Sequence, residues 1–287
     1  MRSLEKASHA PSLREMLLLL LTAALTTPSS GWERWAPRLA PPAASRVAQF
    51  RADGHAALPA LLQPALAAGL LEEALEVHRT FSYEKGYKGT VFFRASGGAA
   101  QAEPGHVPPF DRLYNLEERS PRLRRFVESP HLAAHVAAFL GERRSLRLYS
   151  TSLFLKEPGD SAAQWHKDID ASPIVPASPW GFATLWLALD EVSPETGALR
   201  FASKSHADHC TYFDCHLPCE TVDGCYNVSA ARRLRAGDAT LHTGHTFHFS
   251  LPNRSEKRRV ALTVAFVDAA AEVHGTLPES PGCDFLK

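Results

Sequence analysis

The chain has 287 residues, of which 45% are apolar and 22% are charged, a composition typical of a folded globular protein with room for one large domain. Lysine plus arginine equals aspartate plus glutamate at 31 each, so the chain lacks the net charge by which proteins attract nucleic acid or an anionic membrane surface. The 21 prolines and 17 glycines predict many turns and short elements, which favours a mainly β fold over a bundle of long helices.

Residues 1–30 differ in character from the rest of the chain. Basic residues precede the apolar run MLLLLLTAAL at 16–25, and small polar residues follow it. This order is typical of a targeting leader that is later removed, and the run is too short to leave a stable transmembrane span. The alternative is an ordinary amphipathic or disordered N-terminus. A leader would direct the chain to the secretory pathway or a plastid, and without one we expect a cytoplasmic protein. Residues 31–47 are expected to form a linker.

Two helices are predicted before the first long strand. Pro64 can occupy the first turn of one helix, in which apolar residues recur at helical spacing as far as Leu75. In the second helix Ser129 can act as the cap, Pro130 can take the first helical position, and Gly141 can end the helix. We expect both helices to flank a sheet.

Short apolar runs between turn residues follow the second helix. Strands are predicted within residues 145–159, 182–192, 197–203, 238–244, 246–253 and 258–268. Strands of this kind at close intervals indicate a sandwich or barrel, with the helices preceding the sheet, rather than alternating β and α units. We expect the folded domain to cover residues 48–270 and residues 271–287 to form a C-terminal tail.

Four of the five cysteines lie within one short segment, at Cys210, Cys215, Cys219 and Cys225. If the leader is real, oxidising conditions would favour two disulfides across this segment, with three possible pairings that the sequence cannot separate. Histidines are interleaved with these cysteines, so a structural zinc site is the less favoured alternative.

The segment QWHKDID at 164–170 places His166 and Asp168 two positions apart. On a strand, two such side chains point to the same face and could bind one metal ion together. Two histidines and one carboxylate form the facial ligand set of non-haem Fe(II) enzymes, which leaves coordination positions open for substrates. A second histidine is therefore required. Taken alone, the pair is weak evidence for a metal, and a solvated or hydrogen-bonded pair is the favoured interpretation.

The second histidine can come from LHTGHTFHFS, which contains His242, His245 and His248. Gly244 can form a turn, so that His242 and His248 belong to different strands. Further along, Arg259 begins a strand on which every second residue is small. This face could line a cavity and offer the guanidinium to a carboxylate. The alternative is a strand end at which the arginine reaches water.

In this order the motifs resemble the phytanoyl-CoA dioxygenase family of Fe(II)/2-oxoglutarate oxygenases. The resemblance covers roughly residues 48–268 and rests on FRADGHAALPALL, the H-x-D pair, WLALDEVSPETGALRFASKSH and GDATLHTGHTFHFSLPNRSEKRRVALTVAFVD. It implies a double-stranded β-helix, a cupin-like jelly roll that is mainly β with flanking helices, and this agrees with the strand pattern.

The resemblance also implies the site residues. The implied iron ligands are His166, Asp168 and His248. The implied contacts of 2-oxoglutarate are Arg259, which would bind the far carboxylate, Ser250 beside it, Trp186 and Lys156. His242 and His245 have no counterpart in the family's motif, and we expect them to lie behind the ligands or on the surface.

The activity that the resemblance implies is that of a dioxygenase. It would use Fe(II), O2 and 2-oxoglutarate, with ascorbate as an auxiliary reductant, to hydroxylate a small-molecule or acyl substrate with release of succinate and CO2. Halogenating relatives carry a small residue in place of the acidic ligand, so the presence of Asp168 favours hydroxylation. The chain departs from the family at Ser203-Lys204-Ser205-His206, where Pro-Gly-Ser-His is usual, so the local loop at the substrate mouth is not expected to carry over. A non-catalytic jelly-roll module that binds a metal or a ligand is the alternative, because a fold does not decide a function.

Overall fold

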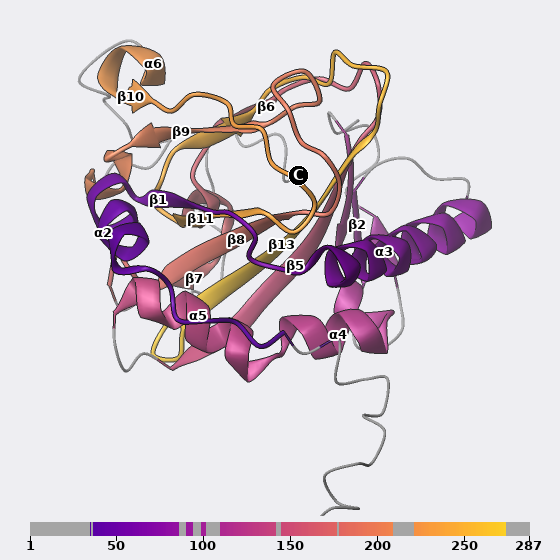
Figure 1. Ribbon diagram of the computed structural model, residues 1–287, viewed down its shortest axis with the longest axis horizontal. Helices are drawn as coiled ribbons and strands as arrows, with labels where there is room; N and C mark the ends of the chain where they lie inside the picture. Colours follow the sequence, from indigo (N-terminus) through magenta and orange to yellow (C-terminus); the bar gives the residue numbers. More distant parts are fainter. Residues whose placement is uncertain are drawn as a thin grey trace, which may run out of the picture. The chain divides into compact units, whose positions relative to one another are not determined.

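An eight-stranded sheet and a four-stranded sheet lie face to face in the computed structural model of the chain (Figure 1). The structure describes residues 35, 37–85, 90–93, 99–101, 110–141, 145–176, 178–208 and 221–273. In spatial order, the large sheet consists of β1 (His55–Leu58), β11 (Ala239–Thr243), β8 (Phe182–Ala188), β13 (Arg259–Asp268), β5 (Leu146–Lys156), β4 (Asp111–Tyr114), β2 (Thr90–Phe93) and β3 (Ala99–Gln101). The small sheet consists of β10 (Asn227–Val228), β9 (Leu199–Ser203), β12 (His248–Ser250) and β6 (Ala163–His166).

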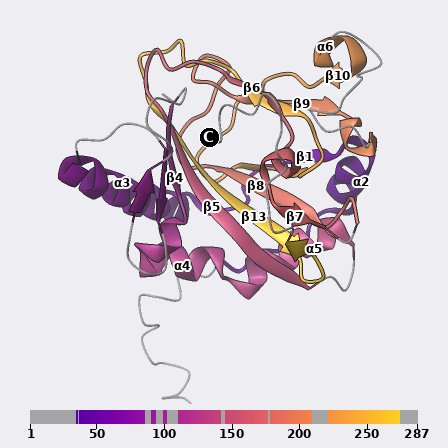
Figure 2. The ribbon, with the colours of Figure 1, turned by 180° about the vertical axis from the view of Figure 1, so that it is seen from behind.

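Neighbouring strands of both sheets run antiparallel, apart from the parallel pair β2 and β4. The long strands β5 and β13 cross the large sheet side by side (Figure 2). A separate two-stranded sheet pairs β7 (Ile174–Val175) with β14 (Glu272–Val273). The mainly β architecture expected from the short apolar runs is therefore confirmed, since β5, β8, β9, β11, β12 and β13 all fall within the predicted ranges.

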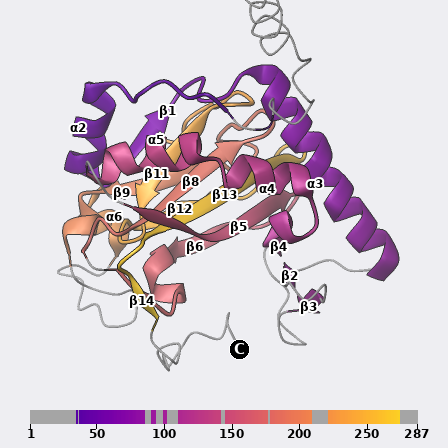
Figure 3. The ribbon, with the colours of Figure 1, turned by 90° about the horizontal axis from the view of Figure 1, so that it is seen from below.

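Helices cover the outer face of the large sheet (Figure 3). They are α2 (Ala44–Asp53), α3 (Pro64–Lys85), α4 (Pro121–Val127) and α5 (Pro130–Leu140), and a short α6 (Val222–Cys225) precedes β10. Three 3-10 turns complete the described elements: η2 (Leu116–Glu118), η3 (Asp168–Ala171) and η4 (Ser205–Ala207). Among the described residues, no helix has both the length and the apolar character that a membrane span requires.

The two predicted helices pack on the sheet as their apolar spacing requires. Leu70 and Ala74 of α3 are buried, and α5 buries the four residues of its predicted face, Leu132, Val136, Phe139 and Leu140. Along β13, the alternate residues Val260, Leu262, Val264 and Phe266 join the same core. The opposite face of β13 is thereby left to line the space between the sheets, because successive side chains of a strand alternate.

The boundaries of the folded region differ from the predicted ones. Helix α2 begins at Ala44, inside the expected linker, and Trp35 is buried in the main core. Strand β14 lies within the expected tail and pairs with β7. Proline and alanine content therefore misled us about residues 37–47, because contacts with distant residues order a segment that its composition alone would not. The expected leader lies outside the described residues.

Cys225 is disulfide-bonded, while Cys210, Cys215 and Cys219 lie outside the described residues. The partner of Cys225 lies outside the described residues, so the two disulfides expected across this segment stay a prediction. The bonded state of Cys225 disfavours the zinc alternative, because a metal ligand must be a free thiolate.

Candidate metal centre

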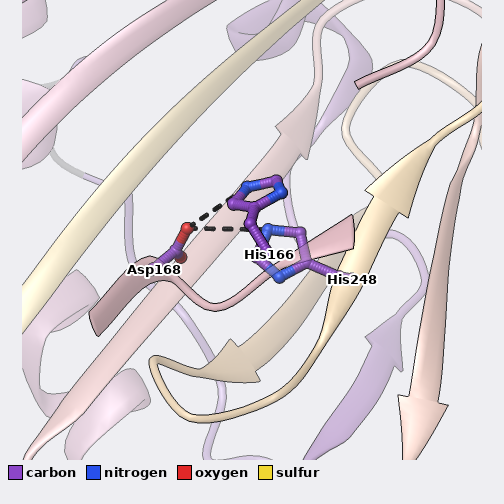
Figure 4. A group of neighbouring side chains, drawn as sticks. All are labelled: His166, Asp168 and His248. Atoms are coloured by element: carbon purple, nitrogen blue, oxygen red, sulfur yellow. Dashed lines mark ion pairs between the residues drawn. The ribbon is translucent and has the colours of Figure 1, made fainter. Parts of the chain in front are cut away.

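Two imidazoles and one carboxylate converge in the space between the sheets. One ligand atom from each of His166, Asp168 and His248 lies within 4.8 Å of the others. Oδ1 of Asp168 is 3.5 Å from Nε2 of His248 and 3.9 Å from Nε2 of His166, and Figure 4 shows the carboxylate pointing toward both rings. His248 pairs with His166 across β12 and β6, so the two rings lie side by side with their centroids 4.2 Å apart.

The backbone fixes which ring nitrogen each histidine presents. Nδ1 of His166 lies 2.7 Å from the carbonyl oxygen of Gln164, and Nδ1 of His248 lies 3.0 Å from that of Thr246. A carbonyl oxygen only accepts hydrogen bonds, so Nδ1 carries the hydrogen in both rings and the lone pair is on Nε2. Both Nε2 atoms face Oδ1 of Asp168, which is the arrangement a shared metal ion needs.

Asp168 reaches the site by a route that differs from the predicted strand. Strand β6 ends at His166, and Asp168 begins the 3-10 turn η3. The intervening Lys167 is buried, with Nζ 3.1 Å from the carbonyl oxygen of Asp208 and 4.5 Å from the ring of Phe247. The amide of Ile169 donates to the carbonyl of Gly244. The predicted convergence is present, but strand alternation is not its cause.

The electrostatics of the triad favour the protonation states that bind a metal. Desolvation lowers the pKa of the partly exposed His166 and of the buried His248, which keeps both rings neutral near pH 7. Burial by itself would raise the pKa of Asp168, but His248, the hydrogen bond from His242 and the other nearby histidines hold it well below its usual value. Neutral imidazoles and an ionised carboxylate are the forms in which these side chains coordinate metals.

The predicted co-substrate residues form a buried wall with two basic side chains. Arg259 and Lys156 are paired across β13 and β5, and both are buried. Nζ of Lys156 lies 2.8 Å from Oγ of Ser250 and 2.5 Å from the carbonyl oxygen of Leu251. The Arg259 guanidinium lies 5.3 Å from the Trp186 ring centre. The four residues that were predicted to contact 2-oxoglutarate therefore lie in one region of the structure.

Arg259 has an unsatisfied donor in this wall. Its Nε is buried and has no hydrogen-bond partner, and within the described residues its guanidinium forms no ion pair. The alternative that Arg259 reaches water is excluded by its 1% exposure. Burial lowers the pKa of Arg259 to about 10, so it remains charged near neutral pH. A buried guanidinium with an unsatisfied Nε is suited to a carboxylate that arrives with a ligand.

The connection between β12 and β13 holds Arg259 in place. The buried Asn253 donates from Nδ2 to the carbonyl oxygens of Lys156, at 3.1 Å, and Lys257, at 2.7 Å. Its Oδ1 accepts from the amide of Ser255 at 3.0 Å. The Pro-Asn-Arg-Ser segment therefore forms a fixed turn that delivers Arg259 to the strand start opposite Lys156.

The structure adds Thr184 and Arg112, which sequence reasoning did not place at the site, and it shows that His242 lies behind the ligands, one of its two expected positions. Thr184 and His242 both bind the second oxygen of Asp168. Arg112 faces the same interior from β4, with its guanidinium 4.7 Å from the Phe110 ring centre and its Nε buried without a partner. The alternation in Asp111–Tyr114 could have suggested an inward-facing Arg112, but only the register against β5 shows it. No contact between His245 and the triad is found among the described residues.

Residues 50–261 match the family model described as phytanoyl-CoA dioxygenase. The chain belongs to the phytanoyl-CoA dioxygenase family. A curated relative from Stutzerimonas stutzeri, described as a probable alpha-ketoglutarate-dependent hypophosphite dioxygenase, is 29% identical over 191 residues. That alignment covers 56% of this chain, and this chain spans 64% of the length of the relative.

Solved structures of similar fold include two proteins of nogalamycin biosynthesis. The non-haem alpha-ketoglutarate-dependent epimerase SnoN is 24% identical with a TM-score of 0.65, and the match covers 83% of this chain and 89% of that one. The carbocyclase SnoK is 22% identical with a TM-score of 0.65, covering 83% and 88%. SnoN has also been solved with Fe3+, alpha-ketoglutarate and nogalamycin RO, with a TM-score of 0.62 and 24% identity, covering 83% of this chain and 90% of that one. At these identities the likeness shows the fold of this member of the phytanoyl-CoA dioxygenase family.

Proposed function

We propose that the protein is an Fe(II)- and 2-oxoglutarate-dependent dioxygenase on a jelly-roll scaffold. It would hydroxylate a small-molecule or acyl substrate. The observation that carries the proposal is the presence, between the same two sheets, of the triad His166, Asp168 and His248 and of the buried Arg259 guanidinium, whose Nε has no hydrogen-bond partner. The first suits a divalent metal with open coordination positions, and the second suits the far carboxylate of a keto acid.

The residues present fit both groups. His166 and His248 would hold iron through Nε2, and Asp168 through Oδ1. Arg259 would bind the far carboxylate of 2-oxoglutarate, with Ser250 and Lys156 beside it. Bound iron supplies the redox chemistry by which 2-oxoglutarate, O2 and a substrate C–H bond give succinate, CO2 and an alcohol. The protein supplies orientation, and the buried wall around Trp186 excludes water from the co-substrate.

Hydroxylation, rather than another outcome, is supported by the intact Asp168. The named activities of SnoN and SnoK, an epimerase and a carbocyclase, belong to those proteins, and they show that the fold serves more than one outcome. The side chain of His166 is 44% exposed while that of His248 is 6% exposed. The triad therefore opens on the His166 side, and a small-molecule substrate would approach from there.

The test is the formation of succinate by the purified protein with Fe(II), O2, ascorbate and 2-oxoglutarate. Asp168→Ala should abolish succinate formation. Asp170→Asn, which changes another acidic residue of the same 3-10 turn, should retain most of it. Hypophosphite, named in the curated relative, is one candidate substrate, and metabolite extracts screened for the gain of one oxygen atom would supply others. Equal trace amounts of succinate from wild type and Asp168→Ala, with all of these substrates offered, would refute the proposal.

The alternative of a non-catalytic binding module predicts a different spectrum. Under anaerobic conditions, Fe(II) and 2-oxoglutarate bound at one centre should give a visible charge-transfer band. Absence of this band in the wild type would show that Fe(II) and 2-oxoglutarate do not bind at one centre. That result would favour the non-catalytic module.

A further inference from the structure

The two oxygens of the Asp168 carboxylate have different surroundings. Oδ1 faces Nε2 of His248 and of His166. Oδ2 accepts a hydrogen bond from Oγ1 of Thr184 at 2.6 Å and lies 3.1 Å from Nε2 of His242. One oxygen is therefore directed at the candidate metal position, while the other is occupied by protein donors.

The two donors come from adjacent strands of the large sheet. Thr184 on β8 and His242 on β11 are direct partners in the antiparallel register, so their side chains leave the same face at the same level. Both are nearly inaccessible, at 6% and 1% exposure. The large sheet thus holds the carboxylate of a residue that follows β6 of the small sheet.

The chemistry of the donors determines what each atom can do. An ionised carboxylate only accepts hydrogen bonds, so both the Thr184 hydroxyl and Nε2 of His242 direct a hydrogen at Oδ2. His242 therefore has no lone pair on Nε2 to offer a metal, although its ring centre is 4.3 Å from that of His248. Its other nitrogen, Nδ1, is buried without a hydrogen-bond partner. These facts separate His242 from the ligands beside it.

We propose that Thr184 and His242 are positioning residues that make Asp168 a one-oxygen ligand. This inference rests on the proposed function. With its lone pairs engaged by two donors, Oδ2 cannot turn to the metal, and Asp168 coordinates through Oδ1 alone. A two-oxygen carboxylate would take up one more of the coordination positions that the keto acid and O2 require. The pair therefore keeps those positions open as well as orienting the ligand.

The experiment compares variants that remove the donors with variants that retain them. Thr184→Val and His242→Leu remove a donor at nearly constant volume, whereas Thr184→Ser and His242→Gln retain one. His245→Ala serves as a matched control, because it changes a histidine on the same connection that does not contact the triad in the described residues. The probes are Fe(II) affinity by anaerobic calorimetry, the Fe(II)–2-oxoglutarate band, and the visible spectrum of Co(II), which responds to coordination number.

We expect each donor-removing variant to bind Fe(II) about 10- to 100-fold more weakly, the range typical when a partner behind a metal ligand is lost. The Co(II) spectrum of the double variant, which combines Thr184→Val with His242→Leu, should change. The spectra of Thr184→Ser, His242→Gln and His245→Ala should resemble that of the wild type. A purely structural role would lower the melting temperature of the metal-free protein without changing the Co(II) spectrum. That melting temperature is therefore measured for every variant.

The outcomes separate the two proposals. If the wild type binds Fe(II) and 2-oxoglutarate, and the double variant keeps both its affinity and its Co(II) spectrum, the role of Thr184 and His242 is refuted while the proposed function stands. The same conclusion follows if His242→Gln and His242→Leu are impaired equally. If the wild type itself binds no Fe(II), both proposals are refuted.

Discussion

Arg259 and Lys156 are direct partners across the antiparallel strands β13 and β5, with both basic side chains buried. Two buried like charges at neighbouring positions are unfavourable unless an anion joins them, so burial and the Arg259 charge lower the pKa of Lys156 and leave its amine mostly neutral in the ligand-free protein. This pairing therefore destabilises the ligand-free protein, whereas in the complex it provides two adjacent groups that can bind an anion. The next two predictions follow from it.

Arg259→Met should weaken the binding of 2-oxoglutarate by at least about 2 kcal/mol, or roughly 30-fold, because a buried charged hydrogen-bond partner is lost. It should leave the melting temperature of the ligand-free protein unchanged or raise it, since a charge whose burial is costly is removed. Calorimetry and thermal unfolding measure the two effects. Arg258→Met, which alters the exposed neighbour, should change neither. A large loss of stability in Arg259→Met without loss of affinity would contradict this role.

Binding of 2-oxoglutarate should take up a proton. Burial and the adjacent Arg259 charge lower the pKa of Lys156 from 10.5 to about 6, so the amine is mostly neutral at pH 7.5 in the free protein. A bound dianion raises this pKa again, so affinity should fall as pH rises above about 6, by up to about tenfold per pH unit. Calorimetry in buffers of different ionisation enthalpy detects the uptake. Identical enthalpies in all buffers, or undiminished uptake in Lys156→Met, would rule it out.

Gly197 should not tolerate a side chain, for two separable reasons. Its φ of 98° is in the left-handed region, and an added Cβ would lie 2.8 Å from the carbonyl oxygen of Leu251 and 3.0 Å from Cδ of Lys156. Gly159 also has positive φ, at 88°, but an added Cβ would meet nothing within 4 Å. Gly159→Ala should therefore cost about 1–2 kcal/mol of stability from backbone strain. Gly197→Ala should cost more and should also weaken 2-oxoglutarate binding by displacing Lys156. Equal effects in urea unfolding would show that the contact is irrelevant.

His55 should make the metal-free protein less stable in acid. Burial, and next the nearby His242, lower the pKa of His55 from 6.5 to about 4. Below pH 6.5 the unfolded chain therefore binds a proton that the folded chain does not, and stability falls as pH drops toward 4. Between pH 7 and pH 5 the loss from this residue is about 2 kcal/mol. His55→Gln should lose about that much less than wild type in urea titrations at the two pH values, and parallel losses would disprove the assignment.

The sequence predicted which side chains converge better than it predicted the contacts that hold them in position. His166, Asp168 and His248 could be selected because their residue types and order are characteristic. The position of Asp168 could not, because it depends on the burial of Lys167 against Phe247 and on the amide of Ile169 reaching Gly244. These are contacts between segments far apart in the chain.

The same limit applies to the role of His242. It was expected behind the ligands or on the surface, and the structure shows the first, with His242 buried and bound to Asp168. Its identity as a donor depends on the register that places it opposite Thr184, and alternation along one strand does not contain that information. Helix ends were easier to predict, because Pro64 and Pro130 act through local backbone geometry.

The hydrogen bonds that hold Asp168 to the large sheet affect how readily the two sheets separate. His166 and His248 belong to the small sheet, whereas the carboxylate between them is held by Thr184 and His242 of the large one. A metal bound by the triad would thus resist transient separation of the two layers. Amide hydrogens of β6 and β12 should then exchange with deuterium more slowly after Fe(II) is added, while those of β5 and β13, deep in one layer, should barely respond.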